Sequence, residues 1–250
     1  MRAIAIAIGL AAWLPIMAGT TPGASALPPT LADTGFYDLP KEPFEPNHPL
    51  WTDGATKSRW IHLPPGTSID KSNPQAWDFP VGTKLWKEFA FERAVETRFI
   101  ERMADGTWRF ATYAWNPAGT EARLAPEDGA TLESGFRIPS RADCLACHEG
   151  PVVPVLGYSA VQLASPPVAT GALGYFHGNC GHCHNENALP GTGFTLAQPG
   201  ANPAVSAKFR AQAVARMKSH DALFRMPPIG VQVPDREGIR LIERYLQENP

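Results

Sequence analysis

The first half of the chain carries short stretches in which apolar and polar residues alternate, a pattern typical of half-buried β-strands. Pro-Pro-Gly at 64–66 and Ala-Asp-Gly at 104–106 are turn signals between these stretches. Strands are therefore predicted at 59–63, 83–91, 96–103 and 107–115. The tryptophans between residues 51 and 115 are expected to pack in the core of the sheet, with carbohydrate binding as their alternative role.

The second half of the chain has the spacing of apolar positions that is typical of amphipathic helices. Ser140 and Asp143 form a capping pattern that opens a short helix, and Asp235 is placed to cap the last one. Two further helices are predicted at 171–182 and 206–218. The last helix is expected to bury an apolar stripe made of Ile239, Ile242, Tyr245 and Leu246.

Strands followed by helices predict the α+β fold class. A β-rich N-terminal domain is expected at 58–165, followed by a small all-α domain at 166–250. An extended Pro-rich arm at 27–57 precedes the sheet, in keeping with the 26 prolines among 250 residues.

The N-terminus has the features of a secretory signal peptide. Arg2 supplies a positive charge, an apolar stretch follows it, and Ala24-Ser25-Ala26 forms a cleavage site. We expect residues 1–26 to be removed and the mature chain to reach the periplasm, with a membrane anchor as the alternative. No transmembrane segment is expected in the mature chain. The net charge of -2 and the lack of any Lys/Arg run argue against a nucleic-acid partner.

All four cysteines of the chain belong to two C-x-x-C pairs, and a histidine follows each pair directly. The first motif is Cys144-Leu145-Ala146-Cys147-His148, and the second is Cys180-Gly181-His182-Cys183-His184. C-x-x-C-H is the attachment signature of c-type haem, in which two thiols bond the haem vinyl groups and the histidine ligates the iron. The sequence therefore predicts two covalently bound haem c groups, with iron as the metal.

Three other uses of the cysteines remain open. A four-cysteine zinc site explains the two pairs but not the two histidines. A thioredoxin-like redox pair lacks the expected βαβ pattern. Two disulfides are common in exported chains of this cysteine count.

The second axial ligand of a cytochrome iron is commonly methionine. Met226 lies between Arg225 and a Pro-Pro pair, before the last helix, and is predicted to ligate the iron of the second haem opposite His184. The first haem has no clear partner for His148. Its candidates are His48, His62, Met103, His177, Met217 and His220, and an iron without a sixth protein ligand is the alternative.

Several further segments resemble a family of bacterial exported di-haem c-type cytochromes. They include Pro49-Leu50-Trp51-Thr52-Asp53-Gly54-Ala55, Phe79-Pro80-Val81-Gly82-Thr83, Glu96-Thr97-Arg98, Tyr113-Ala114-Trp115-Asn116, Ile138-Pro139-Ser140 and Asn179 to Asn185. The resemblance implies a β-rich part that holds one haem and a cytochrome c-like C-terminal domain that holds the other. It also implies that Cys144, Cys147 and His148 bind the first haem, and that Cys180, Cys183, His184 and Met226 bind the second.

The expected function is periplasmic electron transfer between an exported dehydrogenase and a terminal acceptor or oxidase, which would be the protein partners. A di-haem enzyme of the peroxidase type, with the first iron accessible to a small ligand, is the first alternative. A zinc-stabilised binding module is the second. No G-x-S-x-G, H-E-x-x-H or phosphate-loop motif points to another catalytic class.

Overall fold

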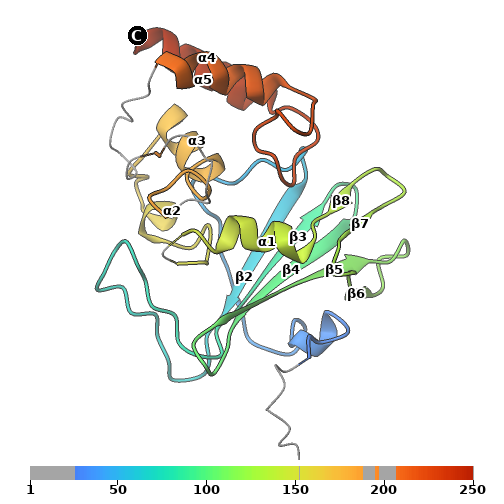
Figure 1. Cartoon of the computed structure of the whole chain (residues 1–250). Coiled ribbons are helices and arrows are strands. Elements are labelled where there is room, and N and C mark those ends of the chain that lie inside the picture. Colours follow the sequence, from blue (N-terminus) through green and yellow to red (C-terminus); the bar gives the residue numbers. More distant parts are fainter. Residues whose placement is uncertain (1–25, 152, 188–194, 197–206, 250) are drawn as a thin grey trace, which may run out of the picture.

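The computed structural model describes residues 26–151, 153–187, 195–196 and 207–249. An antiparallel sheet of six strands in the order β1-β2-β3-β4-β5-β6 forms its centre (Figure 1). Each strand pairs with its neighbour in the sequence. Short turns join β3 to β4, β4 to β5 and β5 to β6, whereas the longer segments 44–55 and 63–83 join β1 to β2 and β2 to β3. The strands are β1 (Glu42–Pro43), β2 (Thr56–His62), β3 (Lys84–Ala90), β4 (Ala94–Arg102), β5 (Trp108–Trp115) and β6 (Ala122–Leu124). The four strands expected from the sequence are confirmed as β2 to β5, with ends that differ by up to three residues.

Side chains on the two faces of this sheet enter two different cores, as the alternation of a strand requires. One core contains Trp86, Phe99 and Tyr113 and is covered by the N-terminal arm through Leu31 and Phe36. The other core joins the sheet to Val155, in the segment that follows the first cysteine motif, through Ile61, Phe79 and Leu85. The predicted core role of the tryptophans is confirmed for Trp60, Trp77, Trp86, Trp108 and Trp115.

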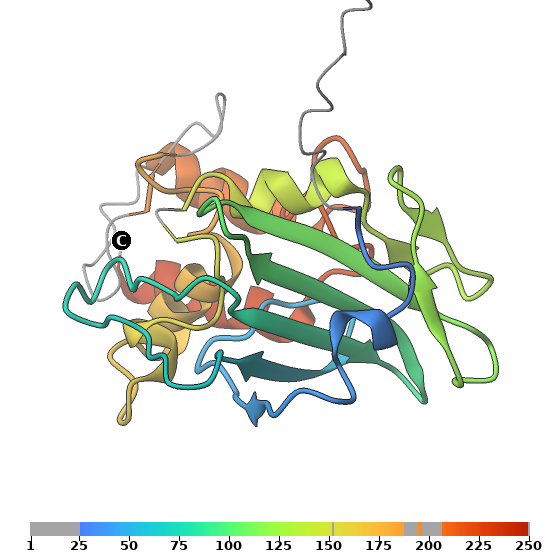
Figure 2. The same ribbon diagram turned by 90° about the horizontal axis from the view of Figure 1, so that it is seen from below.

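The helices lie together on one side of the sheet, and α1 crosses the sheet face (Figures 1 and 2). Asp235 caps the last helix by accepting the backbone N–H groups of Glu237 and Gly238, as predicted. A short 3-10 helix, η1 (Ala32–Thr34), and a separate hairpin of β7 (Ala130–Thr131) and β8 (Arg137–Ile138) complete the connections. The helices are α1 (Arg141–His148), α2 (Ala160–Leu163), α3 (Gly171–Asn179), α4 (Ala207–Lys218) and α5 (Arg236–Glu248).

Ser140 begins helix α1 with a complete capping box. Its hydroxyl accepts the Asp143 N–H at 3.0 Å, and the Asp143 carboxylate accepts the Ser140 N–H at 2.9 Å. Ser140→Ala is expected to lower the free energy of unfolding by about 1 kcal/mol, because an N-terminal N–H of the helix loses its partner. Urea denaturation measures the change, with the exposed loop residue Ser68 changed to Ala as the control. Equal stabilities of the two variants would contradict this role of Ser140.

The predicted fold class, α+β with a β-rich domain followed by a small all-α domain, was wrong. The structure is a β-rich fold with short helices, and its described residues do not show the expected all-α cytochrome c-like domain. The reason lies in contacts across the predicted boundary. The Trp51 N–H donates to the Asn179 side chain at 2.7 Å, and Asp53 accepts the N–H groups of Gln232 and Val233, each at 2.8 Å. Helix α3 and the loop before α5 are therefore hydrogen-bonded to the N-terminal arm and do not form a separate helical domain with each other.

Some expectations concern residues that the structure does not describe. The predicted signal peptide at 1–26 lies outside the described residues except for Ala26, and Ser206 at the start of the predicted helix 206–218 also lies outside them. The domain boundaries at 57/58 and 165/166 remain predictions of the sequence. Among the described helices, none combines the length and the apolar composition needed to cross a lipid bilayer.

Candidate functional site

Helix α1 presents the first cysteine motif on one face. Cys144, Cys147 and His148 stand at positions i, i+3 and i+4, which a helix places on the same side. All three side chains are half-buried and line one cavity. Burial raises the pKa of Cys144, which a hydrogen bond with Thr112 partly offsets. Two thiols and an imidazole therefore face a common space from one short, capped helix.

His148 is held in one orientation and one tautomer. Its Nδ1 lies 2.5 Å from the Pro154 carbonyl oxygen, which can only accept, so Nδ1 carries the proton. Phe110 packs against the imidazole, with ring centroids 5.0 Å apart. Burial lowers the pKa of His148 to about 4, so the ring is neutral near pH 7 and Nε2 keeps its lone pair. Metal-ligating histidines commonly have this form, with the second nitrogen donating to a carbonyl.

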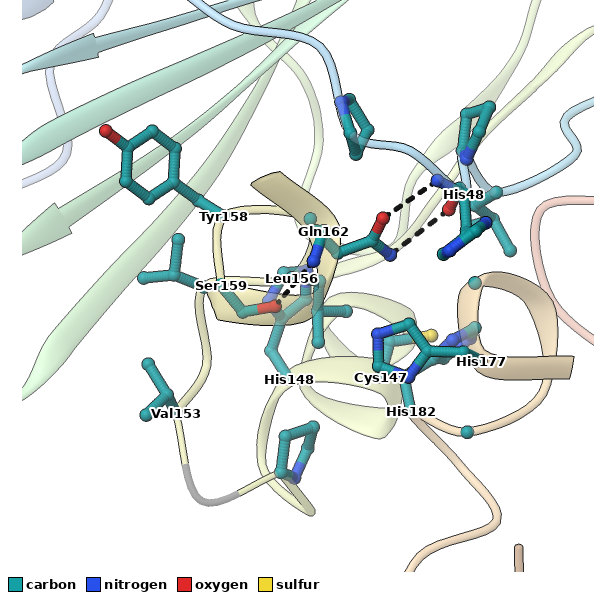
Figure 3. Close-up of a pocket in the computed structure, with 18 of the residues that line it drawn as sticks. His48, Cys147, His148, Val153, Leu156, Tyr158, Ser159, Gln162, His177 and His182 are labelled. Carbon is teal, nitrogen blue, oxygen red and sulfur yellow. Dashed lines mark hydrogen bonds between the residues drawn. The ribbon is translucent and has the colours of Figure 1, made fainter. Parts of the chain in front are cut away.

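The cavity has a volume of about 410 Å³, within the range of small-molecule and cofactor sites. Helix α1, the sheet, the N-terminal arm and helix α3 all contribute to its wall, and Figure 3 shows His48, His148, His177 and His182 around it. Much of its lining is apolar, including Phe44, Trp77, Leu85, Ile100, Val155 and Tyr158. A large and mainly apolar space beside two thiols and a neutral imidazole suits a porphyrin.

The second motif follows directly on helix α3. The His184 N–H donates to the Cys180 carbonyl at 2.9 Å, so the motif is itself a helical turn. His184 is 8 % exposed, and burial raises the pKa of the Cys180 thiol to about 12. Cys180, Cys183 and His184 are not among the described residues that line the cavity. The second motif therefore borders the cavity through Gly181 and His182, whereas its two thiols and the imidazole of His184 do not line it.

The two motifs meet at their second cysteines. The ligand atoms of Cys147, His182 and Cys183 all lie within 4.8 Å of one another. A hydrogen bond between the two thiols raises the pKa of Cys147 and lowers that of Cys183. The motifs are 36 residues apart in the sequence when counted between these cysteines, and no sequence signal predicted their contact. His182 was also missed as a site residue, although its position inside a C-x-x-C pair could have drawn attention to it.

The structure distinguishes between the residues that the sequence offered as sixth ligands of the predicted first haem. Only His48 and His177 line the cavity, with ring centroids 6.1 Å apart. The Nε2 atom of His48 is buried and has no hydrogen-bond partner among the described residues. An imidazole nitrogen of this kind, beside the first motif, fits a site that holds an iron porphyrin. Burial lowers the pKa of His48 and that of His177, which keeps both rings neutral.

The other candidates lie elsewhere. His62 is buried, and its Nδ1 lies 2.7 Å from the Pro40 carbonyl oxygen. Met217 packs in the core between the C-terminal helices, His220 is exposed, and Met103 belongs to the turn after β4.

Met226 lies half-buried on the loop between α4 and α5, where its N–H donates to the Arg216 carbonyl at 3.1 Å. It does not line the cavity of the first motif. The pairing of Met226 with His184 on the second haem stays a prediction, because parts of the chain that follow His184 lie outside the described residues.

Comparisons of this chain with known protein families, curated proteins and solved structures find no match. The functional assignment therefore rests on the chemistry and geometry of the two cysteine motifs and of the cavity beside them.

Proposed function

We propose that the chain is an exported di-haem c-type cytochrome that transfers single electrons between redox proteins. The observation that carries the proposal is the state of His148. It is neutral, its Nδ1 is committed to a backbone carbonyl, and it shares a large apolar cavity with the two thiols of its motif. This arrangement supports covalent attachment of a porphyrin at Cys144 and Cys147 and ligation of its iron by His148.

When bound, haem c supplies an iron that changes between the ferric and ferrous states by one electron. The chain contributes the surroundings of that iron. The Pro154 carbonyl orients His148 and makes its Nε2 more basic, while apolar side chains supply much of the surrounding wall. His48 offers a second imidazole from the N-terminal arm. The contact between Cys147 and Cys183 brings the two attachment points together, which favours electron transfer between the two sites within one chain.

A second candidate function is a metal-stabilised binding module. The cluster of Cys147, His182 and Cys183 favours it, because two thiolates and an imidazole form a common donor set for zinc. In that case the cavity would serve a ligand other than haem. The two candidates differ in which bonds the thiols form, so one preparation can distinguish them.

The test is to produce the full chain in a bacterium that matures c-type cytochromes and to count covalent haem per chain by pyridine haemochrome and denatured mass. We expect two haems in the unaltered protein. Cys144→Ala/Cys147→Ala and Cys180→Ala/Cys183→Ala are each expected to retain one, because each pair attaches its own haem.

The control is His220→Ala, which changes an exposed histidine outside both motifs and should retain two haems. Bound zinc without covalent haem would refute the cytochrome and support the binding module. Binding of carbon monoxide to the ferrous iron of the first haem would show that this iron has no strong sixth ligand. It would argue against ligation of that iron by His48.

A further inference from the structure

Three cations form a row across the sheet face that borders the cavity. Arg59 on β2 is the register partner of Lys87 on β3, and Lys87 is the partner of Arg98 on β4. Residues that are directly opposite on neighbouring strands project to the same face, so these side chains stand side by side. All three line the cavity of the first motif.

Only one of the three cations in the row has an ion-pair partner among the described residues. The Glu96 carboxylate is 0 % exposed and pairs with Arg98, whose Nε and Nη2 lie 2.9 and 2.5 Å from Glu96 Oε1. Within the described part of the chain, the side chains of Arg59 and Lys87 form no ion pair and no hydrogen bond. Of these three cations, only Arg98 has a carboxylate within ion-pair distance among the described residues, and like charges opposite each other destabilise a sheet.

Lys57 and Phe89, which lie beside the row, bring no negative charge. Lys57, on the same face, donates to the Leu50 carbonyl and the Thr52 hydroxyl, which are neutral acceptors. The ring of Phe89 lies 4.7 Å from the Lys87 ammonium and 4.2 Å from the Arg98 guanidinium, and such contacts hold a cation in place without neutralising it.

Burial disfavours the charged forms of Lys87 and Arg59, and repulsion between like charges adds to this effect at Lys87. Burial, followed by the charges of Arg59, Arg98 and Lys57, lowers the pKa of Lys87 well below its ordinary value, and Glu96 opposes this shift. The charge of Glu45 favours the protonated form of Arg59 but does not prevent its pKa from falling. Further carboxylates beside the row would act in the same direction as Glu96 and would relieve the repulsion.

The row begins beneath the first cysteine motif. Arg98 is the register partner of Thr112, and Thr112 hydrogen-bonds the Cys144 thiol. From that point the cations extend across β4, β3 and β2, away from the attachment residue. In haem c the two carboxylate side chains lie on the porphyrin edge opposite the edge that is bonded to cysteine. A porphyrin fixed at Cys144 would therefore direct its carboxylates along the row.

We propose that Arg59, Lys87 and Arg98 form a carboxylate-binding site, and that its occupant is the pair of carboxylates of the haem attached at Cys144 and Cys147. The identity of the occupant rests on the proposed function, whereas the site itself rests on the row of cations. A free dicarboxylate offers the same two carboxylate groups and is the alternative occupant of the site. Two carboxylates match Arg59 and Lys87, the two cations of the row without an ion pair among the described residues.

The experiment compares Lys87→Gln with Lys218→Gln in the full, matured protein. Lys218 is on α4, more than half exposed, and pairs with Glu243, so its replacement removes the same charge outside the cavity. Covalent haem per chain is measured first in each preparation, which tests the proposed function separately. Lys87 is chosen over Arg98 because the loss of Arg98 would leave Glu96 buried without its partner.

With haem carboxylates in the row, Lys87→Gln lowers one of the two reduction potentials, because a positive charge beside the haem stabilises the electron. The expected shift is a tenfold change in the one-electron equilibrium, about 59 mV. Lys218→Gln leaves both potentials unchanged, and added succinate does not raise the melting temperature of the unaltered protein. Arg59→Gln is the second variant and should shift the same potential in the same direction.

A rise of the melting temperature with succinate in the unaltered protein, absent in Lys87→Gln, would show a site for a free dicarboxylate and would overturn haem as its occupant. The succinate measurement also shows whether the row binds carboxylates if the protein carries no covalent haem. Three results together would overturn the whole proposal. Succinate would not change the melting temperature of the unaltered protein, and Lys87→Gln would leave both reduction potentials unchanged. The melting temperature of Lys87→Gln would also equal or exceed that of the unaltered protein. These results would mean that no anion compensates the row.

Discussion

Arg98→Met is expected to lower the free energy of unfolding by about 3–5 kcal/mol, because it leaves a fully buried carboxylate without its cation. Glu96 is 0 % exposed, and Arg98 Nη2 lies 2.5 Å from its Oε1. The second oxygen, Oε2, is buried and has no hydrogen-bond partner among the described residues, so the guanidinium is the main compensation for the charge. Urea denaturation followed by circular dichroism measures the loss.

The matched control is the double variant Arg98→Met/Glu96→Gln, which removes the cation and the carboxylate charge together. It should recover most of the loss, because a neutral amide is much cheaper to bury than a carboxylate. A double variant as unstable as Arg98→Met would mean that packing of the Arg98 side chain, rather than the ion pair, stabilises this part of the sheet.

The stability of Arg98→Met should also depend on pH with a defined sign. Burial raises the pKa of Glu96 above its ordinary value of 4.5, and Arg98 opposes that shift. A group with a raised pKa in the folded state contributes stability below its unfolded pKa and loses it as the pH rises through the folded pKa. Without Arg98 the shift is larger, so the variant should lose stability as the pH rises above the ordinary pKa of 4.5, more steeply than Arg98→Met/Glu96→Gln.

Gly178→Ala is expected to destabilise the contact between helix α3 and the N-terminal arm by about 1–3 kcal/mol. A Cβ atom at this position would overlap the His48 carbonyl oxygen and lie 2.8 Å from the His48 Cβ. The obstacle is backbone, which cannot turn away as a side chain does. The clash therefore outweighs the gain of about 1 kcal/mol that alanine ordinarily brings in a helix.

Gly174→Ala is the informative comparison, because its Cβ would overlap the imidazole of His48 rather than its backbone. Combining Gly174→Ala with His48→Ala should restore stability, whereas combining Gly178→Ala with His48→Ala should not. Thermal unfolding of the single and double variants gives both coupling energies. Equal rescue of the two glycine variants would show that His48 is not held by its backbone against α3.

Local features of this protein could be predicted from the sequence with good accuracy. The strands β2 to β5 follow from alternation, and the caps at Ser140 and Asp235 follow from side chains that reach a backbone N–H two or three residues away. The C-x-x-C-H spacing places thiols and imidazole on one helix face for the same local reason.

The fold class failed where distant segments meet. Helix α3 has an apolar composition typical of a small helical domain, but Gly174 and Gly178 make it a surface for the arm around His48. A glycine in a helix is ambiguous in sequence, since only the neighbouring segment shows whether close approach requires it. The same limit applies to His48, because nothing in the sequence shows that it lines the cavity while His62 and His220 do not.

Sequence alone indicated the two C-x-x-C-H motifs, the strands β2 to β5, the caps of α1 and α5, and the donor types available to a metal ion. Only the tertiary structure decided which histidines share a cavity with the first motif, that Cys147 and Cys183 meet, and that Arg59, Lys87 and Arg98 stand in one row. The physical reason is range. Helical period and capping act within a few residues, whereas strand register and helix docking are set by side chains that lie far apart in the chain and become neighbours only when the core packs.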